Sequence, residues 1–201
     1  MSTELLRRFM ETPVIQRQLW LYDVVQEAVT LEGHFLEFGV GSGSSLRAIK
    51  NAVGARVVHG FDTFEGLPED WVKGPEKTFP KGSFISEPPN VIGTFLHVGD
   101  VAQTLPRWLA VHTSPVAFVH FDMDLYAPTR LALDLLTECL APGAVLVFDE
   151  LCCWDNHSVY PNYMEHEWKA LTEWAEVNDF AVAPFLRDTS ESGAVRVFRR
   201  E

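Results

Sequence analysis

The chain has 201 residues, of which 47% are hydrophobic and 22% are charged, and this composition is that of one globular domain large enough to bury a core without disulfides. Acidic residues outnumber basic ones by 28 to 16, and the formal net charge of −12 would repel a phosphate backbone. We therefore expect no nucleic acid among the partners, and no membrane either, because no apolar run approaches the about 20 residues that a span needs.

The segment before the first predicted strand is expected to be helical. Apolar residues recur near helical spacing over residues 4–30, on both sides of Pro13, which predicts one or two amphipathic helices. The first ten residues, MSTELLRRFM, lack the apolar run of a signal peptide, which favours a cytoplasmic protein. We predict a single domain, in which residues 1–33 form a helical cover and residues 34–201 form the main body.

A glycine-rich turn follows the first predicted strand, residues 34–38. Its glycines are spaced GxGxG and precede a helix that begins near Ser44: Gly39, Gly41 and Gly43. Glycines allow a tight turn and a close approach of a ligand to the backbone, and the first amides of the helix point at that ligand. A dinucleotide fingerprint would need GxGxxG, which weakens the case for a pyrophosphate ligand. Glu37 could instead meet an ammonium or sulfonium charge.

Two further acids end the second and third predicted strands. Asp62 ends RVVHGFD, where a carboxylate can accept both hydroxyls of a ribose, and Asp100 ends HVGD, where it could accept from an adenine amino group. With Glu37 they place acids on three successive strand ends, which is more specific than any one of them. The alternative is that such acids cap the helices that follow, and Asp100 is a good N-cap candidate.

Residues 63–90 interrupt the regular pattern with a long loop that contains five prolines. Long loops in compact domains are usually lids or binding loops, so we predict a lid-like loop. Its aromatic residues either shape a substrate pocket or only pack the loop onto the domain: Phe64, Trp71, Phe79 and Phe84.

The fourth predicted strand ends in two aspartates one residue apart, Asp122 and Asp124, within FVHFDMDLY. Two carboxylates this close can bind a divalent cation, or one can bind metal while the other moves a proton. Glycosyltransferases, some phosphatases and some methyltransferases use such a pair, and the pair alone does not choose between them. A phosphatase is the weakest of the three, because its motif belongs on the first strand.

The fifth predicted strand delivers a second acidic pair, Asp149 and Glu150, to the same edge of the sheet. Asp122, Asp149 and Glu150 could form an oxygen-ligand site for Mg²⁺, which would lower the pKa of a substrate hydroxyl bound to it. Asp124, free of the metal, is then the candidate general base. The alternative is a solvated acidic edge without metal. Of two nearby histidines, His120 is expected to pack on the sheet and His166 to lie near the surface.

The order of the predicted elements indicates an α/β fold. Strand-like apolar runs alternate with helix-like segments up to the second acidic pair, which is typical of a parallel sheet with helices on both faces. After a further helix, two strands over residues 180–186 and 194–198 are joined by the polar turn DTSESG, so we expect an antiparallel pair at one edge. Three cysteines lack zinc-site spacing and are expected to be buried or half-buried thiols: Cys139, Cys152 and Cys153.

The motif ExGxGxG at residues 37–43, with the acid Asp62 after the next strand, resembles class I S-adenosylmethionine-dependent methyltransferases. More narrowly, GFDTFEGLPEDW, HFDMDLYAPT, PGAVLVFDEL and EHEWKA are similar to the macrocin O-methyltransferase branch, which methylates hydroxyls on sugars of natural products. The resemblance covers roughly residues 34–175. It implies a doubly wound, mostly parallel seven-stranded sheet in the order 3-2-1-4-5-7-6, with strand 7 antiparallel and helices on both faces.

The resemblance also implies ligands. S-adenosylmethionine is the expected cofactor, a small molecule with a hydroxyl is the expected acceptor, and Mg²⁺ is expected to assist because the branch carries metal-binding acids at the matching positions. Related enzymes usually have two aspartates, or Asp-Asn, after the fifth strand, and this chain departs from them with Asp149-Glu150. Extra amino-terminal segments in the branch often help to build a dimer contact, so a homodimer is considered.

Two other functions stay open. A metal-dependent glycosyltransferase would explain the DxD pair but would not need ExGxGxG upstream, and preference for a uridine nucleotide would identify it. A regulatory protein that keeps the fold without turnover would bind cofactor but no metal, and would transfer no methyl group.

Overall fold

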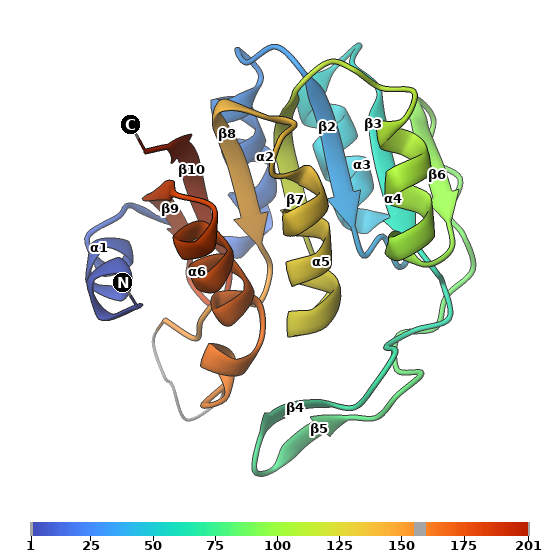
Figure 1. Cartoon of the computed structure of the whole chain (residues 1–201). Helices are drawn as coiled ribbons and strands as arrows, with labels where there is room; N and C mark the ends of the chain where they lie inside the picture. The colour runs from blue at the N-terminus through green and yellow to red at the C-terminus, as the bar shows by residue number, and fades with distance from the viewer. Residues whose placement is uncertain (1, 155–159, 201) are drawn as a thin grey trace.

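A mixed sheet with helices on both faces forms the centre of the computed structural model, which describes residues 2–154 and 160–200 (Figure 1). The strand order in the sheet is β1-β9-β10-β8-β7-β2-β3-β6. These strands are β1 (Val14–Ile15), β2 (His34–Phe38), β3 (Val58–Asp62), β6 (Thr94–Val98), β7 (Val116–Phe121), β8 (Leu140–Phe148), β9 (Phe180–Asp188) and β10 (Gly193–Arg199).

The predicted fold class and strand order are confirmed. Read from β6, the seven predicted strands follow the order 3-2-1-4-5-7-6, and the seventh, β10, runs antiparallel to both neighbours. One correction concerns the edge of the sheet, where the very short strand β1 pairs in parallel with β9. The pairing is supported by a hydrogen bond from Arg187 N to the carbonyl oxygen of Pro13, so the segment after Pro13 extends the sheet before the second helix begins.

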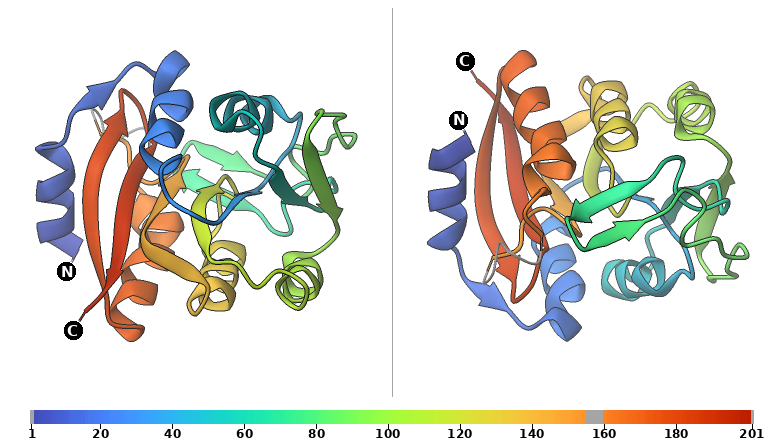
Figure 2. Two further views of the ribbon diagram at one scale, coloured as in Figure 1. Left: turned by 90° about the horizontal axis from the view of Figure 1, so that it is seen from above. Right: turned by 90° about the horizontal axis from the view of Figure 1, so that it is seen from below.

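Helices cover the sheet on both faces, as Figure 2 shows from above and below. Helices α2 and α3 pack together on one face, and α4, α5 and α6 line up on the other, while α1 packs beside β9. The helices are α1 (Ser2–Met10), α2 (Arg17–Ala28), α3 (Ser44–Val53), α4 (Val101–Leu109), α5 (Tyr126–Leu136) and α6 (Glu167–Val177), with a 3₁₀ turn η1 (Tyr163–Glu165) before α6. Among the residues described, no helix is long and apolar enough to span a membrane.

A row of four stacked phenylalanines fixes the edge of the sheet where the acids lie. Phe61, Phe38, Phe121 and Phe148 occupy paired positions on β3, β2, β7 and β8, and their adjacent ring centroids lie 4.9 to 5.7 Å apart. All four are buried, as expected where a parallel sheet is covered on both faces. Each is followed directly by a residue that the sequence predicts for the site: Asp62, Gly39, Asp122 and Asp149.

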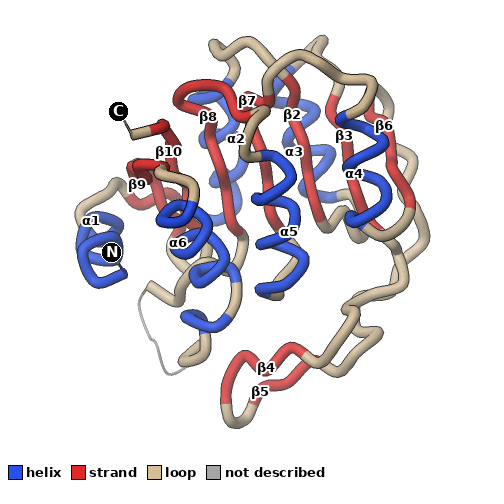
Figure 3. The backbone as a smooth tube through the Cα atoms, in the orientation of Figure 1, coloured by secondary structure: helices blue, strands red, loops and turns tan. Residues whose placement is uncertain are grey.

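The long loop over residues 63–90 contains a hairpin that the sequence interpretation missed. Strands β4 (Trp71–Gly74) and β5 (Lys77–Phe79) pair in antiparallel fashion beyond the carboxyl ends of the parallel strands (Figure 3). The Gly74-Pro75 dipeptide marks the turn between them. The cysteine prediction holds, since Cys152 and Cys153 are buried, Cys139 is half-buried and none forms a disulfide.

Four histidines gather around Trp108 on the α4 side of the sheet, away from the acids. The rings of His34, His59 and His112 lie 5.0 to 5.8 Å apart, and His59 Nδ1 is 3.1 Å from Nε2 of His97. Burial, helped by the neighbouring imidazoles, lowers the pKa of His59 to about 4. His59 is therefore neutral in the folded protein at pH 7, whereas in the unfolded chain it titrates near its usual value of about 6.5.

We expect this histidine to make the protein less stable in acid. Because the pKa of His59 is lowered on folding, the unfolded chain binds more protons than the folded protein between about pH 6.5 and pH 4, and stability falls as the pH drops through that window. Urea unfolding of the wild type and of His59→Phe should show that the wild type loses about 1–3 kcal/mol relative to the variant between pH 7.5 and pH 4.5. A difference that does not change with pH would contradict this expectation.

Candidate functional site

A cavity of about 890 Å³ opens at the carboxyl ends of β2, β3 and β7. One part is lined by the glycine-rich turn and the ends of β3 and β6, another by the residues after β7 and β8, and a third by the β4–β5 hairpin. Its polar lining includes most of the predicted site residues: Ser44, Asp62, Asp100, Asp122, Asp124 and Glu150. The volume is that of a site for a small molecule or a cofactor.

The glycine-rich turn is held in place by the carboxylate of Asp62. Its Oδ2 accepts from the backbone N–H groups of Val40 and Gly41, each at 2.8 Å, and its Oδ1 accepts from Phe64 N at 2.7 Å. An ionised carboxylate offers about four acceptor positions, so about one is left for a ribose hydroxyl. The contact of Asp62 with the hydroxyls of a ribose stays a prediction, for a carboxylate that also holds the glycine-rich turn.

The other predicted cofactor residues are distributed between the cavity and the layer beneath it. Asp100 caps α4, since its Oδ1 accepts from Ala102 N at 2.8 Å, which confirms the N-cap interpretation. It also lines the cavity, and its contact with an adenine amino group stays a prediction. Gly39 and Gly41 line the cavity, whereas Gly43 is the N-cap residue of α3 and faces Pro89 of the long loop.

Glu37 lies beneath the cavity floor. It is fully buried, and its Oε1 is 3.0 Å from Nδ1 of His120, its partner on β7. Burial acts to lower the pKa of His120, but Glu37 and the nearby Asp122 and Asp149 outweigh it and raise that pKa. His120 therefore packs on the sheet as predicted, and its partner Glu37 is not among the residues that line the cavity.

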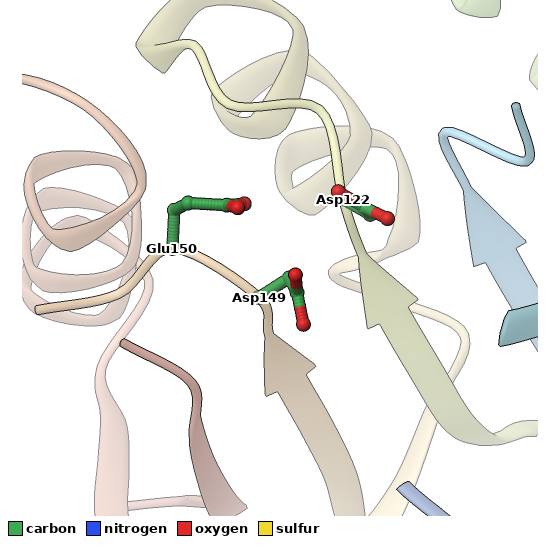
Figure 4. A group of neighbouring side chains, drawn as sticks. All are labelled: Asp122, Asp149 and Glu150. Carbon is green, nitrogen blue, oxygen red and sulfur yellow. The ribbon is translucent and has the colours of Figure 1, made fainter. Parts of the chain in front are cut away.

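The three predicted metal ligands meet at one point. Asp122, Asp149 and Glu150 each offer a carboxylate oxygen, and these oxygens lie within 4.8 Å of one another. Figure 4 shows Glu150 reaching toward Asp122, with Asp149 between the two strand ends. Burial and the charge of Asp149 raise the pKa of both Asp122 and Glu150 well above the usual range. Like charges held this close cannot all stay ionised without a compensating cation or protons.

The residues at this point fit a hard divalent cation such as Mg²⁺. Among the described residues no donor reaches the buried Oε2 of Glu150, and none reaches Oε1 of the buried Glu167. Oxygen ligands with two or three carboxylates are what Mg²⁺ and Ca²⁺ prefer, and an unpaired buried carboxylate oxygen is costly without a partner. The longer side chain of Glu150 does not prevent it from reaching the other two acids.

Asp124 lies on the cavity wall beside this cluster. Its backbone has φ of 63°, in the left-handed region that aspartate and asparagine tolerate better than most residues. Burial raises the pKa of Asp124 to about 6, while Glu150 and Lys73 act in the opposite direction. A carboxylate with a pKa near the working pH is suited to accept a proton.

The hairpin brings a buried lysine that the sequence interpretation did not single out. Lys73 on β4 forms an ion pair with Glu191, and its Nζ lies 4.6 Å and 4.8 Å from the ring centroids of Trp71 and Tyr160. Asn162 Nδ2 donates to the carbonyl oxygen of Val72 at 3.0 Å. The hairpin is therefore docked on the segment that leads into α6.

The aromatic residues of the long loop have two roles. Trp71, Phe79 and Phe84 line the cavity, whereas Phe64 is buried among the residues that α3 and β2 contribute to the core. His166 lies near the surface, as predicted, with Nε2 3.3 Å from the carbonyl oxygen of Val72. The pocket and packing interpretations of the loop thus each hold for different residues.

Glu167 was also missed. It lies in the first turn of α6, is fully buried, and its Oε2 accepts from Glu150 N at 3.2 Å. Burial and the charges of Asp124 and Asp122 raise its pKa well above the usual range. The only signal was the segment EHEWKA, in which the third residue falls on the buried face of the helix.

Comparisons with known proteins show which family and fold the chain is similar to. A family model described as a methyltransferase domain matches residues 36–151. The solved structure of the calicheamicin methyltransferase CalS11 is similar with 24% identity and a TM-score of 0.70, covering 97% of this chain and 90% of that one. The O-methyltransferase NovP has 19% identity and a TM-score of 0.63, covering 89% and 79% of the two chains.

A further structure is that of the MycE methyltransferase of mycinamycin biosynthesis in complex with Mg and SAH. It has 16% identity and a TM-score of 0.56, and the match covers 88% of this chain and 47% of that one. No functionally curated protein matches the sequence significantly.

Proposed function

Because the chain belongs to the methyltransferase-domain family that matches residues 36–151, we propose that it transfers the methyl group of S-adenosylmethionine to a hydroxyl of a small molecule. The sequence-based prediction of a methyltransferase is confirmed by this membership. The hydroxyl acceptor is supported by the similarity to NovP, which is an O-methyltransferase. A sugar or another natural product is the acceptor class that the predicted branch favours.

One observation carries the proposal: a single cavity joins the glycine-rich turn to the acidic cluster. Gly41, Asp62 and Asp100 lie on the part suited to a nucleoside, and Asp124 and Glu150 lie on the part where a hydroxyl would react. A cofactor bound along the turn would therefore end beside the acids. Acidic walls also favour a ligand that carries a positive sulfonium centre.

The cofactor would be held mainly by backbone groups and by two carboxylates. Ser44 begins α3, whose first N–H groups face the glycine-rich turn, and Gly41 leaves open space where a side chain would otherwise stand. Asp62 can accept one further hydroxyl, and Asp100 lies beside it on the rim. When bound, the sulfonium supplies the methyl group and leaves as a neutral thioether.

The acceptor hydroxyl would be positioned by the acids after β7 and β8. Asp122, Asp149 and Glu150 would hold Mg²⁺, which supplies a Lewis acid that lowers the pKa of the hydroxyl. Asp124 takes the proton of that hydroxyl as the oxygen bonds to the methyl carbon. The hairpin residues Trp71 and Phe79 also line the cavity, where their apolar rings would reduce the access of water to the reacting atoms.

A calorimetric titration of metal-stripped protein tests the cofactor. We expect S-adenosylmethionine to bind with a micromolar dissociation constant, and we expect Mg²⁺ to bind in a separate titration. A uridine diphosphate sugar serves as the control ligand and should not bind. A diphosphate would need free N–H donors in the glycine-rich turn, and two of these N–H groups already donate to Asp62.

Two results would decide against the proposal. Metal-dependent binding of the sugar nucleotide in place of S-adenosylmethionine would identify a glycosyltransferase. Binding of the cofactor without Mg²⁺ binding, and without methyl transfer to any of a panel of hydroxylated acceptors, would identify a cofactor-binding protein without turnover.

A further inference from the structure

The polar turn between β9 and β10, DTSESG, is built around a buried carboxylate. Asp188 is fully buried, and its Oδ1 accepts from the backbone N–H groups of Ser190 and Ser192 at 2.8 Å and 2.9 Å. These bonds close the turn and fix the position of Ser192. Through Ser192 the turn also contacts Asp149.

An arginine at the start of α2 joins this turn to the acidic cluster. Arg17 Nη1 donates to Asp188 Oδ2 at 2.9 Å and to Ser192 Oγ at 2.9 Å, and Arg17 Nη2 donates to Asp149 Oδ2 at 2.7 Å. The planar guanidinium serves two acids at once, which a lysine ammonium on a flexible chain does less well.

Ser192 holds the other oxygen of the same aspartate. Its Oγ lies 3.0 Å from Asp149 Oδ1 and 3.0 Å from the Asp149 carbonyl oxygen. Arg17 therefore donates to one carboxylate oxygen of Asp149, and Ser192 shares its single hydroxyl proton between the other carboxylate oxygen and the Asp149 carbonyl oxygen. A carboxylate has about four acceptor positions, so two are left to face those acids.

We propose that Arg17 and Ser192 are positioning residues that fix the Asp149 carboxylate for cation binding. This inference rests on the proposed metal-assisted function. Metal-ligating carboxylates are themselves hydrogen-bonded, and loss of such an outer partner typically weakens metal affinity 10- to 100-fold. Arg17 also reduces the repulsion among the acids while the metal is absent, which keeps Asp149 from turning toward solvent.

A purely structural role for Arg17 makes a different prediction. Its side chain is 47% exposed, but its partner Asp188 is fully buried, so loss of Arg17 would also lower the free energy of unfolding by leaving that carboxylate without its cation. If Arg17 only tethered α2 to the sheet, its loss would leave Mg²⁺ affinity unchanged, like the loss of Arg196, which joins β10 to the same helix through Glu27 at 3.1 Å. Arg196 does not contact the acidic cluster, so it is a matched control.

The test is calorimetric titration of Mg²⁺ into metal-stripped wild type, Arg17→Met, Ser192→Ala and Arg196→Met. We expect Arg17→Met to weaken Mg²⁺ binding 10- to 100-fold, Ser192→Ala to weaken it in the same direction, and Arg196→Met to leave it within twofold of wild type. Arg17→Lys should recover part of the loss. S-adenosylmethionine affinity without metal should stay within twofold of wild type in all four variants.

Each other outcome counts against the inference. Equal Mg²⁺ affinity in Arg17→Met and wild type, or an equal loss in Arg196→Met, would overturn the positioning role while leaving the proposed function intact. Absence of Mg²⁺ binding by the wild type would overturn the metal-assisted reaction and the inference together. If Arg17→Met does not fold, unchanged Mg²⁺ affinity in Ser192→Ala still overturns the role.

Discussion

Asp124→Asn is expected to lower kcat by a factor of about 10²–10⁴, the usual contribution of a positioned general base. The amide cannot take the proton of the acceptor hydroxyl, whereas the carboxylate, whose pKa burial raises to about 6, can. The rate of S-adenosylhomocysteine release would be measured with an acceptor found by screening hydroxylated compounds. Affinity for S-adenosylmethionine and for Mg²⁺ should change little, because the proposed metal ligands are other residues.

Asparagine is the right replacement because the backbone of Asp124 has φ of 63°. Asparagine tolerates this region, so the loss reports on the missing proton acceptor and not on a distorted turn. The control is Asp134→Asn on the exposed side of α5, where the aspartate pairs only with Arg130 in the described structure. A kcat for Asp124→Asn within tenfold of wild type would remove Asp124 from the role of base.

The elements that the sequence predicted best are those whose composition fits only one kind of secondary structure. The first predicted strand became β2 with the predicted bounds, residues 34–38, and helix α3 begins at the predicted Ser44. β7 is buried at every position, so a continuous apolar run ending in an acid was sufficient to place it.

The missed elements depend on tertiary contacts. β1 has two residues and β5 has three, too few for periodicity to be recognised. The β4–β5 hairpin is held by contacts to Tyr160 and Asn162, which lie about 90 residues away in the chain. A composition rich in proline and glycine indicated a loop, and only these distant contacts show where a hairpin forms within it.

The site divides in the same way. The sequence predicted that the acids at the strand ends lie close together, because parallel strands end at one edge of a sheet. The structure places Asp122, Asp149 and Glu150 within reach of one cation. Arg17 and Glu167 come from helices, whose rotation against the sheet is decided by packing. Their contacts with Asp149 and Glu150 could not be derived from spacing alone.

Gly39→Ala is expected to destabilise the protein by about 2–5 kcal/mol, as the sum of left-handed strain and overpacking. The φ of Gly39 is 83°, and a Cβ there would lie 1.7 Å from the carbonyl oxygen of Asp122 and 2.6 Å from its carbonyl carbon. These are backbone atoms, so no side chain can move away to make room. β2 and β7 would have to separate at the point where Asp122 N donates to the carbonyl oxygen of Phe38.

Gly41→Ala separates the two causes of that loss. Gly41 also has a positive φ, 48°, but an added Cβ would meet no atom within 4 Å, so only the strain of about 1–2 kcal/mol remains. Urea unfolding of both variants should therefore show a clearly larger loss for Gly39→Ala, and equal losses would contradict the close approach. The same approach is what brings the glycine-rich turn against Asp122. In the proposed reaction, a glycine at this position would therefore set the distance between the methyl donor and the acids that position its acceptor.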